Sequence, residues 1–114
     1  IGGANILIMG LTFKENCPDI RNTRVVDIVA ELLEYNCAVD VYDPWVKPEV
    51  LGKACPVNMV KMPDMGAYDG IILAVPHEEF RHLGAEAIRQ FGKSKHVFYD
   101  VKSCFESDAS DLRL

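Results

Sequence analysis

The chain has 114 residues, 49% of them hydrophobic, which suits one compact domain with a single core. Its 25% charged and 9% aromatic residues are ordinary globular usage, so disordered, collagen-like and coiled-coil chains are excluded. The 12 basic and 17 acidic residues give a formal net charge of −5, which argues against a broad nucleic-acid surface, and the length leaves little room for an enzyme that holds both a dinucleotide and a substrate.

The first predicted element is a strand over residues 5–10, a continuous apolar run that ends in Gly10. Such a run is typical of a strand buried on both faces of a parallel sheet. Residues 11–22 have no apolar periodicity and contain Pro18, so we expect a loop there.

A helix and a second strand are predicted next. Apolar residues recur at helical spacing between residues 25 and 33, and Asn22 or Thr23 can cap the start of a helix that ends near Asn36. Residues 38–43 then predict a strand that stops before a proline, which cannot donate to a strand ladder.

The middle of the chain, residues 45–69, is rich in Pro and Gly, and only residues 57–60 resemble a strand there. Residues 70–75 repeat the pattern of the first strand and predict the central strand of the sheet. The apolar positions that follow lie on one face of a single predicted helix that ends near Gly92: Phe80, Leu83, Ala87, Ile88 and Phe91.

The last predicted strand covers residues 97–101, and a polar tail follows it. Alternating strands and helices predict right-handed β-α-β units that bind ligands at the carboxyl ends of the strands. The expected fold is α/β: a small, Rossmann-like, open parallel sheet with helices on both faces, in three layers. Residues 1–114 are expected to form a single domain, with residues 103–114 as its C-terminal tail.

The cysteine spacing and the hydropathy of the chain bear on metal binding, on the cellular compartment and on membrane association. The four cysteines form no C-x-x-C pair, so we expect no metal site and favour reduced thiols in a cytoplasmic protein: Cys17, Cys37, Cys55 and Cys104. The longest apolar runs are far shorter than the roughly 20 residues that cross a bilayer. We therefore expect neither a membrane nor a nucleic acid as a partner. Because the chain starts without Met, we expect a fragment of a longer protein.

The loop after the first strand bears on dinucleotide binding. A dinucleotide-binding unit carries G-x-G-x-x-G here, because the glycines let backbone amides approach the pyrophosphate. Residues 10–15 keep only the first glycine, and Thr12 stands at the second position. Asp43 stands where an acid would hold a ribose, but an Asp before Pro is also an ordinary strand terminator. The loop therefore does not favour NAD.

The same loop carries charged groups that suit an anionic ligand. Lys14 offers a point charge, Arg21 a bidentate fork that Asp19 can orient, and the start of the next helix offers backbone amides. The structural alternative is a solvated Lys14 beside an Asp19–Arg21 surface ion pair. The spacing alone leaves both interpretations open.

Residues 10–23 also carry a recognisable signature. Their sequence, GLTFKENCPDIRNT, resembles the G-x-x-F-K-x-x-x-x-D-x-R-x-S/T pattern that opens the carboxy-terminal domain of the UDP-glucose/GDP-mannose dehydrogenase family. Residues 42–44, 71–75 and 99–102 resemble further landmarks of that domain, so the resemblance covers nearly the whole chain. Residues 16–22 are most similar to the bacterial branch that acts on UDP-N-acetylhexosamines or their uronates.

The resemblance implies a substrate and a site. Enzymes of this family use two NAD per turnover to oxidise the C6 hydroxyl of a nucleotide sugar to a carboxylate, and their carboxy-terminal domain binds the nucleotide of the UDP-sugar. By this resemblance Phe13 and Lys14 line the nucleotide-sugar site, with Lys14 near the phosphates. Asp19 and Arg21 support that loop or reach the ligand. Arg113 matches a late basic residue that contacts nucleotide in some members.

The resemblance also implies what this chain lacks. The family's NAD-binding domain and catalytic thiol lie in preceding domains, so we expect the chain alone to be inactive. The missing N-terminal and central domains are its expected partners, in a full-length homo-oligomer. Cys17 has no neighbouring base and is not expected to be a nucleophile. His77 follows the central strand and either faces the ligand edge or is structural.

Two other functions are weighed against this one. A receiver-like signalling domain needs clustered carboxylates at its strand ends to hold a divalent cation, and residues 10–12 after the first strand contain no acid. A non-catalytic interaction module would use the apolar segment 44–46, in which Trp45 either contacts another domain or packs under its own loop.

Overall fold

The structure is a computed structural model that describes residues 3–11, 25–46, 58–101, 105 and 110–113. Its elements follow in the order β1 (Asn5–Met9), α1 (Val25–Glu34), β2 (Ala38–Tyr42), β3 (Asn58–Met59), β4 (Tyr68–Leu73), α3 (Glu78–Leu83), α4 (Ala85–Arg89), β5 (Gly92–Asp100) and β6 (Leu112–Arg113). Within this described part, no helix is long and apolar enough to span a membrane.

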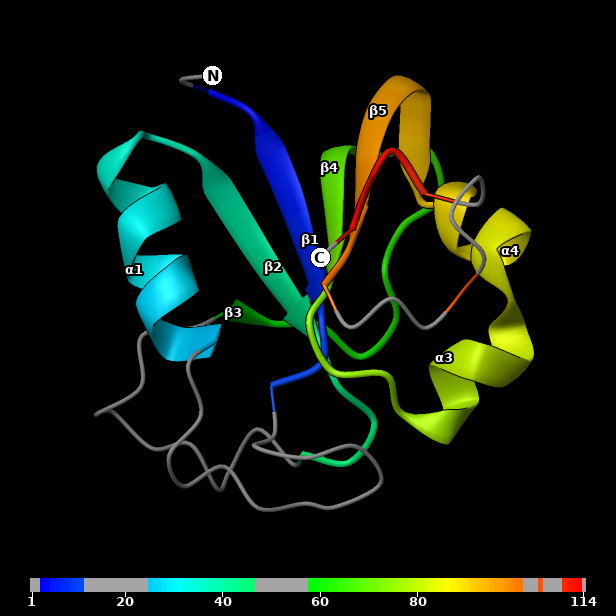
Figure 1. Cartoon of the computed structure of the whole chain (residues 1–114). Helices are drawn as coiled ribbons and strands as arrows, with labels where there is room; N and C mark the ends of the chain where they lie inside the picture. The colour runs from blue at the N-terminus through cyan, green and yellow to red at the C-terminus, as the bar shows by residue number, and fades with distance from the viewer. Residues whose placement is uncertain (1–2, 12–24, 47–57, 102–104, 106–109, 114) are drawn as a thin grey trace.

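The strands form one parallel sheet. Their order is β3-β2-β1-β4-β5-β6, and each neighbouring pair is parallel. Helix α1 lies on one side of the sheet, and α3 and α4 lie on the other (Figure 1). The expected three-layer, Rossmann-like fold is therefore confirmed, with β1 and β4 at its centre.

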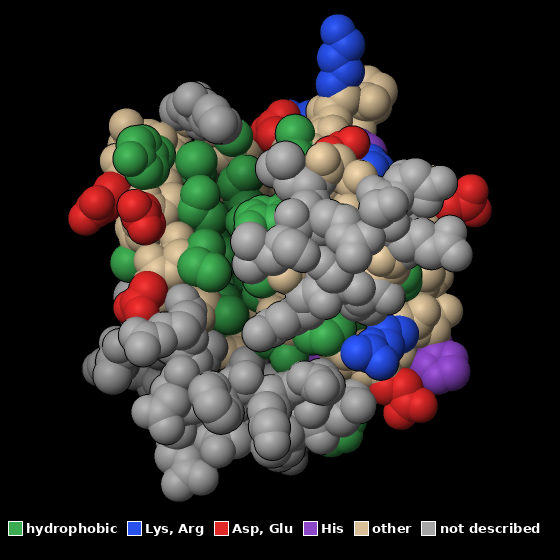
Figure 2. Space-filling view, viewed as in Figure 1, with side chains coloured by type: hydrophobic (Ala, Val, Ile, Leu, Met, Phe, Trp, Pro, Cys, Tyr) green, Lys and Arg blue, Asp and Glu red, His purple; other side chains and the backbone are tan. Residues whose placement is uncertain are grey.

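The sheet has an apolar core on each face because successive side chains of a strand point to opposite sides. The core on the α1 side is built from α1 and the two strands beneath it: Ile6, Ile8, Val25, Val29, Val39 and Val41. The core under α3 and α4 uses the alternate positions: Leu7, Met9, Ile71, Leu73, Phe80, Ile88 and Phe98. Figure 2 shows a band of hydrophobic side chains on the face beside α1, the side on which Ile28, Leu32 and Ile72 are only partly buried.

The structure differs from the predicted elements in the second half of the chain. The single helix expected over residues 80–91 is two short helices, because Gly84 between them has φ 85° and ψ 157°, far from helical values. Strand β5 starts at Gly92, five residues earlier than expected. Leu112–Arg113 in the tail add a strand beside β5, where only a polar tail was expected.

Candidate functional site

The carboxyl ends of the parallel strands meet at one edge of the sheet. In the pairing register, Met9 of β1 lies beside Tyr42 of β2 and Leu73 of β4, Leu73 lies beside Asp100, and Asp100 lies beside Arg113. Since neighbouring strands are about 4.8 Å apart, Arg113 lies roughly 14 Å across the sheet from Met9. The backbone of Arg113 is therefore at the same edge as the start of the signature loop.

The predicted site residues are only partly within the described structure. Phe13, Lys14, Asp19 and Arg21 lie outside the described residues, and Arg113 is described in its backbone alone. Leu11 is the last described residue before the signature loop continues. Lys14 is three residues further along the chain than Leu11, and three residues span at most about 11 Å.

Gly10, the first residue of the signature, is required by a close backbone approach. It has φ 102°, and a Cβ atom on it would lie 2.6 Å from Cβ and 2.8 Å from the amide nitrogen of Val75. The amides of Ala74 and Val75 both donate to the carbonyl of Met9, at 3.0 and 3.3 Å, and hold the two segments together. This glycine serves the packing of β1 against the turn after β4.

Asp43, just after β2, is a buried carboxylate with both oxygens engaged. The residue as a whole is 3% exposed, and its side chain is fully buried. Oδ2 accepts hydrogen bonds from the Leu11 amide at 2.7 Å and from His77 Nε2 at 2.9 Å, and Oδ1 accepts one from the Trp45 amide at 2.8 Å. Burial acts to raise the pKa of Asp43, but the hydrogen bonds from His77, Leu11 and Trp45 outweigh it and hold the pKa below its usual value. Asp43 is therefore ionised at neutral pH, and Nε2 of His77 carries the proton between them.

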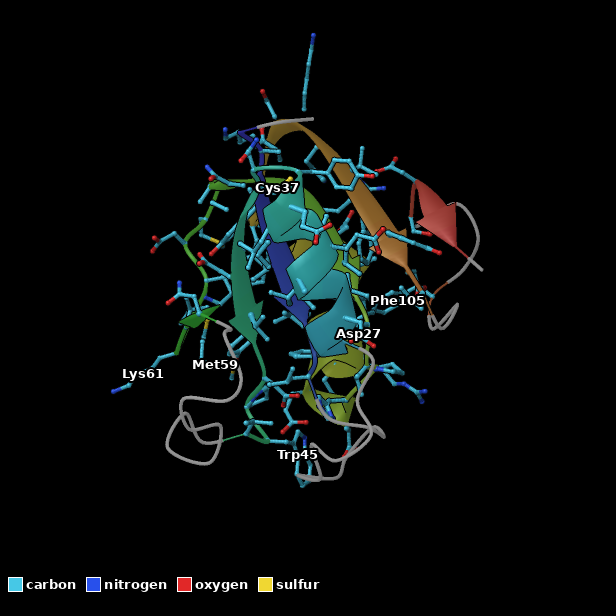
Figure 3. The ribbon with its side chains drawn as sticks, turned by 90° about the vertical axis from the view of Figure 1, so that its left-hand side faces the viewer. Asp27, Cys37, Trp45, Met59, Lys61 and Phe105 are labelled. Carbon is cyan, nitrogen blue, oxygen red and sulfur yellow. The ribbon has the colours of Figure 1, made fainter. Side chains whose placement is uncertain are left out.

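His77 is enclosed by rings. The side chain is fully buried. The Trp45 indole stacks on it with centroids 5.9 Å apart and an interplanar angle of 28°, and the Phe80 ring meets it edge-on at 5.5 Å. Trp45 Nε1 in turn donates to Glu79 Oε1 at 2.9 Å, and Figure 3 shows Trp45 at the end of the molecule where β2 terminates. Trp45 thus packs on its own domain, and His77 is structural and closed to ligands.

Sequence reasoning missed the contact between Asp43 and His77 because 34 residues separate them. The available signal was topological: Asp43 ends one predicted strand and His77 lies two residues beyond another, and the carboxyl ends of these strands meet at one edge of a parallel sheet. Taken singly, Asp43 is consistent with a strand terminator or a ribose ligand, and His77 with either a ligand-facing or a structural residue.

These contacts do not fit a dinucleotide at the first turn. A ribose would need an accessible carboxylate after β2, but Asp43 is buried and its oxygens already accept three protein hydrogen bonds. The carboxylate of Asp100, the last residue of β5, does not fit a metal ligand of a receiver-like site either, because Asp100 is buried and accepts a hydrogen bond from the Phe105 amide at 2.9 Å.

One shallow hollow of about 510 Å³ lies beside Trp45. It is lined by Trp45, Glu78, Glu79, His82 and Leu83. Two carboxylates in this wall repel phosphate groups, so the hollow does not suit the anionic part of a nucleotide.

Comparisons with known proteins agree with this architecture. A family model described as the UDP-binding domain of the UDP-glucose/GDP-mannose dehydrogenase family matches residues 7–107. The chain is 60% identical over 114 residues to a UDP-N-acetyl-D-glucosamine 6-dehydrogenase of Pseudomonas aeruginosa and 49% identical to one of Salmonella typhi. In both cases all of this chain aligns, and it spans 27% of the length of the relative.

Solved structures show the same fold. A UDP-glucose dehydrogenase from Pyrobaculum islandicum aligns with a TM-score of 0.72 at 25% identity, over 99% of this chain and 25% of that protein. An NDP-N-acetyl-D-galactosaminuronic acid dehydrogenase from Methanosarcina mazei Go1 aligns with a TM-score of 0.75 at 22% identity, over 95% of this chain and 22% of that protein.

Proposed function

The chain belongs to the UDP-glucose/GDP-mannose dehydrogenase family, as its UDP-binding domain, and from this we propose that it binds the nucleotide of a UDP-sugar for an NAD-dependent 6-dehydrogenase. The family match over residues 7–107 carries the proposal. The match includes residues 10–23, whose F-K-x-x-x-x-D-x-R spacing resembles the signature of that family.

The geometry of the sheet supports a site built from two ends of the chain. Phe13 and Lys14 follow Leu11 at the carboxyl end of β1, and Arg113 ends β6 at the same edge. We assign Phe13 to the wall of the site and Lys14 and Arg113 to the charges of the diphosphate, which favours several cationic donors. Asp19 and Arg21 support the loop or extend the contact to the ligand.

The reaction of the whole enzyme would convert the C6 hydroxymethyl group of the sugar to a carboxylate. This is a four-electron oxidation, for which two NAD would act as hydride acceptors and water would supply the second carboxylate oxygen. The described residues do not fit NAD, so we place NAD and the catalytic thiol in other domains of the parent protein. This chain's part is to bind and orient the nucleotide, which it performs without catalytic groups of its own.

UDP-N-acetylglucosamine is the sugar nucleotide we propose. The support is the 60% and 49% identity to two relatives named as UDP-N-acetyl-D-glucosamine 6-dehydrogenases, with full coverage of this chain. Contacts that select the sugar would come mainly from the other domains, which join this one in a homo-oligomeric cytoplasmic enzyme.

Calorimetric titration of the chain with UDP, and separately with NAD, tests the proposal. We expect UDP to bind and NAD not to bind. Lys14→Gln should weaken UDP binding about tenfold, because it removes a charge-assisted contact to phosphate. Lys95→Gln is the matched control: Lys95 is exposed and lies in the amino-terminal half of β5, away from the carboxyl edge. NAD binding without UDP binding would overturn the proposal, as would equal losses of UDP affinity in the two variants.

A further inference from the structure

Asp43 and His77 form a buried, hydrogen-bonded pair that has no role in the proposed reaction. The side chains of both residues are fully buried, so neither touches a substrate. An ionised carboxylate is costly to bury unless its oxygens are satisfied, and here three donors satisfy them. A hydrophobic pair would fill the same space, so the function of the pair lies in what it holds.

We propose that the Asp43–His77 pair positions the nucleotide-sugar loop by fixing the Leu11 amide at the point where the chain leaves β1. This inference rests on the proposed function, since it assigns Asp43 and His77 as positioning residues for the same UDP site. Asp43 Oδ2 is the shared atom, because it accepts both the Leu11 amide at 2.7 Å and His77 Nε2 at 2.9 Å.

The pair joins three segments that follow three different strands. Leu11 follows β1, Asp43 follows β2, and His77 follows β4, while Trp45 caps the pair from outside. The ends of the three strands are thereby linked by hydrogen bonds to the carboxylate of Asp43. A shift of the turn after β4 or of the segment after β2 would therefore move Leu11.

Only a few residues separate Leu11 from the proposed ligand-binding residues, so the fixed position of Leu11 limits where those residues can lie. Phe13 is two residues beyond Leu11 and Lys14 is three, so they lie at most about 7 and 11 Å away. The backbone of Gly10, immediately before Leu11, is packed directly against Val75 and cannot move toward it. The start of the loop is thus held by the packing of Gly10 and by the hydrogen bond of the Leu11 amide. A small displacement of Leu11 would therefore displace the groups that we propose to contact the phosphates.

Three substitutions separate positioning from general stability. His77→Phe keeps a ring under Trp45 but removes the donor to Asp43. His77→Gln is the conservative rescue, because its side-chain amide restores an N–H at a similar reach. Ile88→Val is the control, since Ile88 is fully buried in the core under α3 and α4, away from the pair. Trp45 is the only tryptophan in the chain, so its fluorescence reports whether the stack on residue 77 persists in each variant.

UDP affinity by calorimetry and the amide resonances of Leu11 and Phe13 by NMR are the readouts. We expect His77→Phe to weaken UDP binding about tenfold and to shift both resonances, His77→Gln to restore both, and Ile88→Val to lower the melting temperature with neither effect. If His77→Phe does not fold, Asp43→Asn serves instead, because its amide N–H₂ must face one of the donors now bound by the carboxylate.

Unchanged resonances and wild-type UDP affinity in His77→Phe would overturn the positioning role while the proposed function stands. An equal loss of affinity in Ile88→Val would also overturn it, because the effect would then follow stability alone. If the wild-type chain binds NAD and not UDP, the proposed function fails. The Leu11 and Phe13 resonances then still decide whether the pair fixes the start of the loop.

Discussion

The buried carboxylate of Asp43 holds together three segments at the carboxyl edge of the sheet. It accepts amide hydrogen bonds from both sides along the chain, from Leu11 and from Trp45, and a third hydrogen bond from His77. All three donors point at an ionised carboxylate in a buried setting, where charge-assisted hydrogen bonds are strongest. The stability of this edge therefore depends on the charge of Asp43.

Acid should remove this stabilisation in a defined pH window. The pKa of Asp43 in the folded protein is below its ordinary value of 3.8, so the unfolded state binds the proton first as the pH falls. The contribution of Asp43 is then fully present above about pH 4 and is lost as the pH falls through the folded pKa. We expect Asp43→Asn to be about 2 kcal/mol less stable than wild type at pH 7.

Urea unfolding of both proteins at several pH values measures this effect. The difference in free energy of unfolding between wild type and Asp43→Asn should shrink as the pH falls below about 4 and through the lowered pKa of Asp43. The pKa values of Asp69 and Asp111 are also lowered, but those groups are common to both proteins and cancel in the difference. A difference that stays constant across this range would contradict the assignment.

At the scale of the element, the break between α3 and α4 depends on backbone geometry. The apolar positions Phe80 and Ile88 fit one continuous helix, and both do face the same core. Gly84 between them has φ 85° and ψ 157°, a conformation that essentially only glycine adopts. The break turns the chain so that both short helices cover the sheet.

Replacement of Gly84 by Ala distinguishes this geometry from helix propensity. Propensity alone predicts that Ala stabilises a helix by about 0.5–1 kcal/mol relative to Gly. The structure predicts the opposite sign: a loss of about 2 kcal/mol and a melting temperature lower by roughly 10 °C, because residue 84 would be strained. Differential scanning calorimetry measures the change.

Gly66→Ala is the matched control for Gly84→Ala. Both glycines have positive φ and open space around the position of a Cβ atom, but Gly66, at φ 65°, lies near the left-handed helical region that other residues enter at a cost of about 1 kcal/mol. The loss at Gly84 should therefore exceed the loss at Gly66. A stabilised Gly84→Ala protein would show that α3 and α4 can fuse.

Elements were more predictable from the sequence than the contacts between them. The apolar runs at β1 and β4 and the periodicity of α1 are local patterns, and each was found within two residues of its observed bounds. Strand β6 has only two residues and no pattern of its own, because it is stabilised by pairing with Tyr99 and Asp100. The signature loop was found by its residue types, whereas the pair that holds its start depends on contacts distant in sequence.

At the scale of the whole molecule, the end of the chain returns to the edge where the signature loop begins. Asp111 secures this return: its amide donates to the Phe98 carbonyl at 2.9 Å, and its Oδ2 accepts the Phe98 amide at 2.8 Å and Arg89 Nη1 at 3.2 Å. Arg89 also lies over the Phe98 ring, with its guanidinium carbon 5.5 Å from the ring centre. Asp111 thereby sets the position of Arg113, two residues later.

Replacement of Asp111 should weaken UDP binding at the proposed site, although Asp111 itself is not proposed to contact the ligand. Asp111→Ala leaves the Phe98 amide without its side-chain acceptor and removes the ion pair between Asp111 and Arg89, so β6 would lose its register on β5 and Arg113 its place at the edge. We expect a loss of UDP affinity of about fivefold, close to that of Arg113→Ala, because both changes would remove the cationic contact to the diphosphate that we propose for Arg113.

Calorimetry on single and double variants tests whether the two residues act through one contact. Glu86→Ala is the control, since it removes an exposed acid from α4 without touching the tail, and it should leave UDP affinity unchanged. If Asp111 acts through Arg113, the double variant should bind UDP no more weakly than Arg113→Ala alone, because the second change removes nothing further. Additive losses would instead mean that Asp111 supports the site by another route, and wild-type affinity in Arg113→Ala would exclude the tail from the site.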